Sequence, residues 1–204
     1  MSGIDSTDVP SVEEFLAARP ALVHRVTLCG LTSADEGEFV RLVRASKEQH
    51  EPWMSLPSTP EAFADYLARR RPGTGEQFAI RLHDEGALVG IVNINSIIRG
   101  RFQNGSVSYA AFAPSAGRGY LTEGLKLVIR YAFEGLRLHR LEANIQPGNQ
   151  ASLRLVQRAG FRYEGLAPEM LFINGEWADH ERWAITASMA DFPLPRPHPS
   201  LPAR

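Results

Sequence analysis

Two glycines in a short loop are the clearest chemical signal in this sequence. Residues 115–120 read SAGRGY and stand between a segment with the pattern of a strand and one with the pattern of a helix. Glycine lets the backbone approach a ligand closely and adopt positive φ, and the free N–H groups at a helix start bind anions with help from the helix dipole. The loop therefore predicts a binding site for the pyrophosphate of a phosphorylated cofactor.

Three other interpretations of this loop compete. An ordinary Gly-rich turn is the first, and it stays open. A P-loop is the second, but its Gly-Lys-Ser/Thr ending is absent. A dinucleotide fingerprint is the third: Gly117 and Gly119 supply two of its glycines and Glu142 stands at a tolerable distance, but Thr122 occupies the place of the third glycine. The strands predicted before the loop form an antiparallel meander, which argues against a Rossmann domain.

The cysteine and histidine content argues against metal and disulfide chemistry. Cys29 is the only cysteine, and the six histidines show neither a cysteine partner set nor His-x-x-x-His spacing. We therefore expect no metal site and a packing role for Cys29. The 22 Lys and Arg residues against 23 Asp and Glu give a net charge of -1, so no overall positive field exists to hold a nucleic acid or an anionic membrane.

The chain that positions this loop has 204 residues, and a domain typically has roughly 150, so we expect one domain. Its composition, 44% hydrophobic and 22% charged, is that of an ordinary globular protein. Periodicity predicts strands at 22–28, 77–82, 87–98, 106–113, 140–145, 170–173 and 176–185. It predicts helices after the capping pairs Ser11 and Glu14 and Ser33 and Glu36, with Phe39, Leu42 and Val43 on one face of the second, and at 58–70, 120–133 and 149–159.

Turn signals connect these elements into a fold. Asp84-Glu85-Gly86 and Asn174-Gly175 predict two hairpins, and the helix between strands 106–113 and 140–145 fits a parallel crossover. We therefore expect an α/β (α+β) fold, a mixed and mostly antiparallel sheet with helices on both faces. Residues 1–21 are expected to be a flexible segment with a short helix, 22–190 the folded domain, and 191–204 an extended Pro-rich tail. A polar start and no apolar stretch of about 18 residues predict a soluble cytoplasmic protein.

The element order and the loop resemble the GNAT family of acetyl-CoA-dependent N-acetyltransferases over roughly residues 23–189. Residues 117–123, GRGYLTE, are similar to the family's pyrophosphate-binding motif, and 149–152, NQAS, with 160–161, GF, to its second cofactor motif. Within the family, segments 51–53, 97–100, 139–140, 174–177 and 179–180 resemble the RimJ/RimL type, which acetylates the N-terminal α-amine of ribosomal proteins. One departure is Pro114, where the family usually carries Gln or Arg.

This resemblance implies acetyl-CoA as co-substrate, bound where the sheet splays, and no metal. It implies transfer of the acetyl group to a primary amine by direct attack, so Cys29 is not expected to be a nucleophile. The acceptor is expected to be a protein N-terminus; a small amine such as an antibiotic or polyamine, and a non-catalytic acyl-CoA-binding module, are alternatives. A homodimer is one further arrangement that stays open. The cofactor contacts implied are Phe112, Ala113, Gly117, Arg118, Gly119, Tyr120, Leu121, Thr122, Asn149 and Ser152.

The resemblance also implies an acid for the departing sulfur. Many members carry a Tyr where this chain has Val156, so that acid is missing. Ser152, one turn after Asn149, matches the RimJ/RimL pattern, and its hydroxyl is expected to protonate or hydrogen-bond the thiolate. A helix-capping role is the alternative for Ser152, while Asn149 is expected to bind the cofactor and to cap the helix as well.

The general base is the open part of this prediction. Ser106 stands at the strand position where many relatives carry Glu, and Glu169 is a candidate catalytic carboxylate, with a solvated hairpin position as its alternative. An α-amine with a reference pKa near 8 is about a tenth neutral at pH 7, so a weak base or water would suffice for it. Glu51, Trp53 and Tyr109 are expected to line the acceptor groove, with simple packing as the alternative for Trp53.

Overall fold

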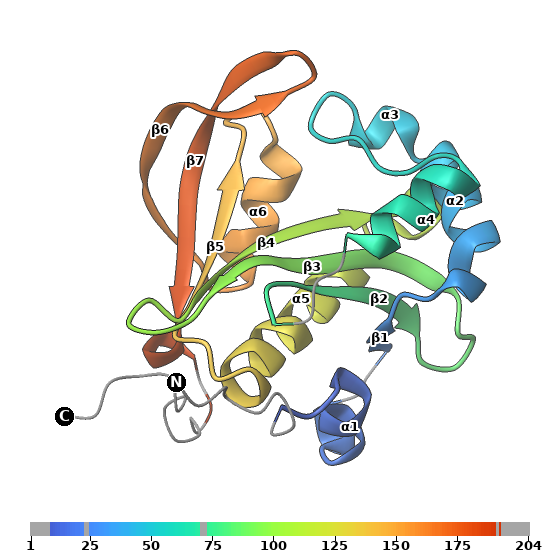
Figure 1. Cartoon of the computed structure of the whole chain (residues 1–204), viewed down its shortest axis with the longest axis horizontal. Coiled ribbons are helices and arrows are strands. Elements are labelled where there is room, and N and C mark those ends of the chain that lie inside the picture. The colour runs from blue at the N-terminus through green and yellow to red at the C-terminus, as the bar shows by residue number, and fades with distance from the viewer. Residues whose placement is uncertain (1–8, 23–24, 70–72, 191, 193–204) are drawn as a thin grey trace.

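A seven-stranded sheet with strand order β1-β2-β3-β4-β5-β7-β6 forms the centre of the molecule (Figure 1). The computed structural model describes residues 9–22, 25–69, 73–190 and 192. Neighbouring strands are antiparallel except β4 and β5, which are parallel and joined through α5. The mixed, mostly antiparallel sheet and its parallel crossover are therefore confirmed. The strands are β1 Val26–Gly30, β2 Glu76–Leu82, β3 Leu88–Ile98, β4 Asn104–Ala111, β5 Arg140–Ile145, β6 Arg162–Ile173 and β7 Glu176–Thr186.

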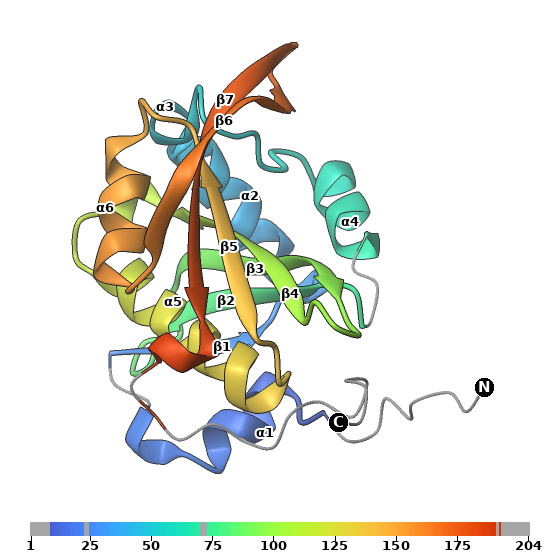
Figure 2. The same cartoon turned by 90° about the vertical axis from the view of Figure 1, so that its left-hand side faces the viewer.

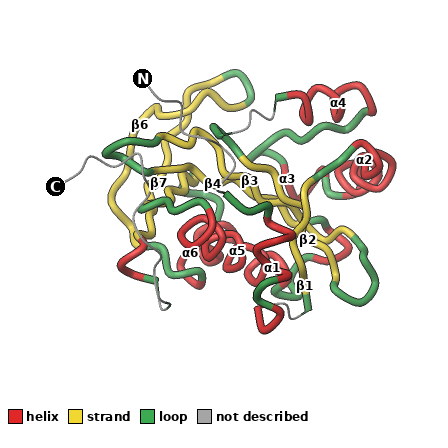
Figure 3. The backbone as a smooth tube through the Cα atoms, turned by 60° about the horizontal axis from the view of Figure 1, so that its bottom comes forward, coloured by secondary structure: helices red, strands yellow, loops and turns green. Residues whose placement is uncertain are grey.

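Helices cover both faces of this sheet, as Figures 2 and 3 show, with α1, α5 and α6 on one face and α2, α3 and α4 on the other. Two clusters of buried apolar side chains correspond to the two faces. Leu125 of α5 and Val156 of α6 belong to one cluster, and Phe39 of α2 and Phe63 of α4 belong to the other. The helices are α1 Val12–Ala17, α2 Glu36–Ala45, α3 Lys47–His50, α4 Pro60–Ala68, α5 Tyr120–Arg130, which continues as a π-helical turn Tyr131–Gly135, and α6 Gln150–Arg158.

The short N-terminal helix α1 forms as expected and packs into the main core. The Ser11 hydroxyl accepts a hydrogen bond from the Glu14 N–H, and the Glu14 carboxylate accepts one from the Ser11 N–H, so the capping box is confirmed. The Phe15 ring lies edge-on to Tyr131, with ring centroids 5.3 Å apart. Phe15 of α1 thus belongs to the same apolar cluster as Leu125 of α5.

The first strand and the second helix begin at other residues than expected. β1 starts at Val26 rather than 22, because its pairing with β2 runs from Val26 opposite Leu82 to Gly30 opposite Phe78. Leu22 belongs to a 3-10 turn instead. The second capping box also lies one residue earlier: Asp35 accepts a hydrogen bond of 2.7 Å from the N–H of Thr32, and a 3-10 turn precedes α2.

The β6–β7 hairpin is longer than its sequence signal. Asn174 and Gly175 both have positive φ, and Ile173 pairs with Glu176, so the predicted turn is confirmed. β6, however, begins at Arg162 instead of 170. Its pairing with β7 is interrupted between Tyr163 and Gly165 and again between 167 and 171. These irregularities break the alternation that would have revealed the strand.

A flexible start of the chain and an extended Pro-rich tail at 191–204 were expected at the two chain ends. Residues 1–8, 191 and 193–204 lie outside the described residues, so these parts of both expectations stay predictions.

Two further expectations concern a membrane span and a metal site. No helix in the described ranges is long and apolar enough to cross a membrane. Within the same ranges, no group of three or more His, Cys, Asp and Glu side chains is placed to hold a metal ion.

Candidate active site

The site begins where β4 and β5 part. These strands pair only from Asn104 opposite Arg140 to Ser106 opposite Glu142, while β5 stays paired with β7 as far as Ile145. Beyond Ser106 the β4 edge that faces β5 is open, so the splayed sheet is confirmed. Three cavities of about 500, 110 and 570 Å³ meet there, and Tyr109 and Met54 line all three.

A backbone cradle lines the 500 Å³ cavity. Gly117 and Gly119 have φ of 77° and 83°, and Gly119 is the N-cap of α5. The first helical hydrogen bond runs from the Glu123 N–H to the Gly119 carbonyl, so the N–H groups of residues 120–122 have no acceptor within the helix. A Cβ added to Gly117 would meet nothing within 4 Å. Open space in front of free N–H donors fits a diphosphate.

An ion pair fixes the outer side of this cradle. The Arg25 guanidinium donates to the Glu123 carboxylate at 2.9 Å and to the Arg118 carbonyl at 3.2 Å, and it lies over the Tyr120 ring. The hydrogen bond to Glu123 raises the pKa of Arg25. Glu123 therefore orders the loop rather than moving protons. The Arg118 side chain is exposed and does not line the cavity.

Two hydroxyl groups meet at the centre of the site. The Tyr109 hydroxyl lies 2.7 Å from the Ser152 Oγ, and the Ser152 N–H donates to Oδ1 of Asn149, the N-cap of α6. Burial raises the pKa of Tyr109 well above its ordinary value. Tyr109 was expected on the acceptor side alone, and the structure brings it to the predicted acid. Val156, at the position of the usual family Tyr, is fully buried in the core.

The two expected cofactor contacts before the loop are not brought into the cavity. The Phe112 side chain is fully buried, with its ring centroid 5.8 Å from that of Phe39, and the Ala113 N–H already donates to the Ser46 hydroxyl at 2.8 Å. Neither residue is among those that line the 500 Å³ cavity. The 3-10 turn at Ala113–Ser115 ends the strand and turns these groups away.

Of the expected acceptor residues, the structure brings Trp53 to the site and leaves Glu51 outside. Trp53 lines two of the cavities, and a Cβ added to Gly148 would lie 3.0 Å from its ring. Glu51 is exposed and 3.8 Å from Lys47 Nζ, and it lines none of the three cavities.

Glu169 is also placed away from the site. It sits at φ 47° in an irregular part of β6, it is exposed, and its N–H donates to the Asp179 carboxylate at 2.9 Å. Ser106 lies between Asn95 and Glu142 in the sheet, and Glu142 accepts a hydrogen bond from Arg140. The carboxylates considered from the sequence thus do not reach the three cavities.

Several residues that line the three cavities were not predicted from the sequence. Arg154 and Arg158 line the 500 Å³ cavity from α6, and their spacing of four along a helix was the available signal. Tyr66 and Asn93 line the 570 Å³ cavity and are hydrogen-bonded, with 2.8 Å between Asn93 Nδ2 and the Tyr66 hydroxyl. His180 lines the smallest cavity, and the resemblance of residues 179–180 to the RimJ/RimL type implies no role for it.

Cys29 lies outside the three cavities and packs against the apolar cluster that contains Phe39. It is half-buried, and burial raises the pKa of its thiol. A thiol kept protonated is a poor nucleophile, in agreement with a packing role.

Comparisons with known proteins agree with this geometry. "Probable N-acetyltransferase YjcK" of Bacillus subtilis is 38% identical over 121 residues, which are 59% of this chain and 67% of that protein. The "[Ribosomal protein uS5]-alanine N-acetyltransferase" of Escherichia coli is 34% identical over 116 residues, 57% of this chain and 60% of that protein. The chain thus spans only about three fifths of this second relative.

A solved structure and a family model extend the match. Mycobacterium smegmatis RimJ in complex with CoA-disulfide has a TM-score of 0.76 and 27% identity, covering 82% of this chain and 84% of that one. The family model described as "Acetyltransferase (GNAT) domain" matches residues 25–162, which include the cradle, the splay and α6. The chain belongs to the GNAT family of acetyl-CoA-dependent N-acetyltransferases.

Proposed function

We propose that this enzyme acetylates the N-terminal α-amine of a protein, of the ribosomal-protein kind, by direct attack of the amine on the acetyl-CoA thioester. The observation that carries the chemistry is the Tyr109–Ser152 hydroxyl pair, 2.7 Å apart, at the point where the three cavities meet. The acceptor is supported by the 34% identity to an enzyme named for acetylating an alanine of ribosomal protein uS5. A cytoplasmic location follows from such an acceptor and stays a prediction.

The cradle and α6 would hold the cofactor. The N–H groups of residues 120–122 would bind the diphosphate, and Arg154 and Arg158 give the same cavity positive charge. Asn149 and Ser152 line the cavity from the start of α6. The cofactor contributes the thioester and a thiolate leaving group when bound.

The open edge of β4 would hold the extended arm of the cofactor. The Phe112 N–H donates to Val89 on β3, so alternation along the strand turns the backbone groups of Tyr109 and Ala111 to the opposite edge. The Ala111 carbonyl already accepts hydrogen bonds from Gln49 and His50. The backbone N–H and C=O of Tyr109 then remain for an amide of the bound molecule.

The hydroxyl pair would protonate the leaving sulfur. In this arrangement the Tyr109 phenol donates to Ser152 Oγ, and the Ser152 hydroxyl donates to the sulfur. The raised pKa of Tyr109 keeps the phenol protonated and able to donate. A two-hydroxyl chain replaces the single tyrosine that this chain lacks at Val156.

The acceptor would enter through the 570 Å³ cavity between α4 and the sheet and reach the adjoining smallest cavity, which Trp53 lines. This cavity adjoins Tyr109. Its wall has the neutral polar groups Tyr66 and Asn93 and one charged residue of each sign, the exposed Asp65 and Arg69. Neutralising a Lys ammonium at pH 7 costs about 4 to 5 kcal/mol, and an α-ammonium only about 1 to 1.4 kcal/mol. A site that receives none of the predicted carboxylates is therefore better suited to an α-amine.

The test is mass spectrometry on one peptide that begins with alanine and carries an internal lysine, incubated with acetyl-CoA at neutral pH. We expect acetylation of the α-amine and an unmodified lysine. A matched peptide with a blocked N-terminus should stay unmodified, and a polyamine in the same assay should be a poor acceptor. Predominant acetylation of lysine or of the polyamine contradicts the proposal, and CoA binding without any transfer would indicate a binding module.

A further inference from the structure

The smallest cavity contains two hydrogen-bond acceptors that the reaction described above does not use. They belong to His180 on β7 and Asn144 on β5, and both residues line this cavity together with Tyr109 and Ser152. We propose that His180 Nε2 is the general base that takes the proton of the attacking amine, and that Asn144 Oδ1 holds the amine beside it. The inference rests on the proposed function only for the identity of the amine.

The hydrogen bond of His180 determines which ring nitrogen is free. His180 is buried, and its Nδ1 lies 2.9 Å from the Ala178 carbonyl oxygen. Because a carbonyl only accepts, Nδ1 carries the hydrogen and Nε2 is the acceptor of the neutral ring. No hydrogen bond joins Nε2 to any residue in the part of the chain that the structure describes. A fixed ring with a free lone pair is the arrangement that a general base needs.

Asn144 provides the second, independent observation. Its Oδ1 is buried and has no hydrogen-bond partner among the described residues. Asn144 lies opposite Arg182 in the β5–β7 register, and His180 is two residues from Arg182 on the same strand, so alternation puts Asn144 and His180 on one face. A buried acceptor without a partner is costly. A primary amine, which brings N–H donors, would satisfy both acceptors.

The lining of the cavity leaves His180 without a competitor. Among the described lining residues it is the one side chain with an imidazole or a carboxylate. Tyr109 is kept as a phenol by burial. Two charged side chains on the same face of β5 and β7, Glu142 and Arg182, lie 3.9 Å apart as an ion pair and do not line the cavity. Proton removal and proton donation are thereby assigned to different groups across the cavity.

The transfer balances with these groups. The amine nitrogen forms the C–N bond with its lone pair, and the C–S bond breaks with its electron pair on sulfur. His180 Nε2 takes the proton that the nitrogen loses and releases it to solvent. The sulfur takes a proton from the Ser152–Tyr109 pair, which solvent restores. The products are the amide and the thiol, and no other reactant is consumed.

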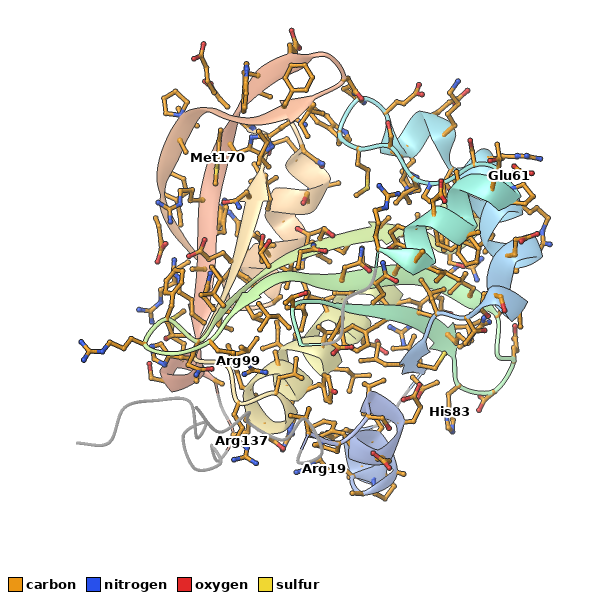
Figure 4. The ribbon with its side chains drawn as sticks, viewed as in Figure 1. Arg19, Glu61, His83, Arg99, Arg137 and Met170 are labelled. Atoms are coloured by element: carbon orange, nitrogen blue, oxygen red, sulfur yellow. The ribbon has the colours of Figure 1, made fainter. Side chains whose placement is uncertain are left out.

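The first experiment compares His180→Gln with wild type on the amine that wild type accepts. Gln keeps a donor for the Ala178 carbonyl and removes the base. We expect kcat to fall by roughly 100-fold, with CoA affinity by calorimetry unchanged within about twofold. His83→Gln is the matched control, because His83 is exposed in the turn between β2 and β3, far from β7 in Figure 4, and it should keep wild-type kcat. A His180→Gln enzyme within about threefold of wild type overturns the proposal.

Chemical rescue separates a base from a structural role. Added imidazole should restore activity of His180→Ala by about tenfold or more, in a saturable manner, and should leave wild type and His83→Ala unchanged. A folded His180→Ala protein that imidazole does not rescue contradicts the base. If both His180 variants fail to fold, Asn144→Leu decides: a rise of about tenfold in KM for the amine supports the site, and an unchanged KM overturns it.

The choice of acceptor keeps this proposal separate from the previous one. If wild type acetylates a polyamine but not the alanine peptide, the proposed protein acceptor fails. The His180 comparison is then made on the polyamine with the same expected loss and rescue. The result for His180 therefore tests the general base whichever amine serves as acceptor.

Discussion

The proposed cofactor side and the proposed acceptor side of the site are built by different kinds of contact. On the cofactor side, one continuous stretch, residues 117–122, supplies N–H groups from its backbone. On the acceptor side, Trp53 packs against Gly148, the Gln146 amide donates to the Trp53 carbonyl over a separation of 93 residues, and the Asn174 amide donates to the Pro52 carbonyl over 122 residues. In Figure 1 the tip of the β6–β7 hairpin lies beside the loop after α3.

The two sides therefore depend on different features of the chain. A backbone cradle depends on glycine conformations and on the start of one helix, and side chains matter little to it. Three loops that hold one another depend on the shape of their side chains. Substitutions on the two sides are therefore expected to change different constants, CoA affinity on one side and acceptor KM on the other.

The largest effect is expected for Gly117→Asp. It adds a negative charge and a side chain to the space in front of the N–H groups, and we expect CoA affinity to fall by roughly 100-fold, about 2.7 kcal/mol. Gly73→Asp is the control, since Gly73 also has positive φ and nothing within 4 Å of an added Cβ. Calorimetry measures the affinity, and thermal unfolding checks that both variants are folded. Normal CoA binding by a folded Gly117→Asp protein would mean that the loop is not the diphosphate site.

The next effect concerns the hydroxyl pair. Ser152→Ala and Tyr109→Phe should each lower kcat by about tenfold to 50-fold at unchanged CoA affinity, and the double variant should be no slower than the worse single one. Tyr163→Phe is the control, because Tyr163 is exposed on β6, the strand at the edge of the sheet. Fully additive losses in the double-mutant cycle would show that the two hydroxyls act separately.

The same pair predicts a pH profile. Burial raises the pKa of Tyr109 above the ordinary value near 10, so the protonated phenol persists to higher pH than in an unfolded chain. Between about pH 6 and pH 9, kcat should show no decline from Tyr109 ionisation. A falling limb in this range that Tyr109→Phe abolishes would contradict the burial argument.

The two sides also differ in how far the sequence could predict them. Gly117, Gly119 and the start of α5 are adjacent in sequence, so spacing alone was enough to place the cradle. Glu169 could not be placed, because the irregular pairing of β6 breaks the alternation on which a face assignment depends. The hydroxyl pair joins residues 43 positions apart, across a splay that no local pattern encodes.

The buried groups of the site show the same limit. The family resemblance implied that Phe112 contacts the cofactor, but its ring is part of the apolar cluster on the α2 face. His180 carried only a motif resemblance. The tautomer of His180 depends on its hydrogen bond to the Ala178 carbonyl on the same strand, and the cavity beside it is lined in part by β5. Neither feature can be predicted from the sequence.

A moderate effect is expected for Gly148→Val on the acceptor side. A Cβ at this position would lie 3.0 Å from the Trp53 ring, so the indole must move. We expect acceptor KM to rise by about fivefold to tenfold, with CoA affinity unchanged. Gly37→Val, where an added Cβ meets nothing within 4 Å, is the control for adding a branched side chain. A change confined to CoA affinity would contradict the separation of the two sides.

The smallest effect is expected for Arg25→Met, which removes the side-chain tether of the cradle and keeps its apolar stem. Because Arg25 is exposed, its bonds to Glu123 and to the Arg118 carbonyl are screened by water and salt. We expect CoA affinity to fall by only about twofold to fivefold, and the difference from wild type to shrink at high salt. Arg101→Met, another exposed arginine in the loop after β3, should have no effect. Calorimetry at two salt concentrations measures both variants. A loss as large as that of Gly117→Asp would show that the cradle depends on the Arg25 side chain rather than on its own backbone. The proposed difference between a cofactor side built from backbone groups and an acceptor side built from side chains would then be wrong.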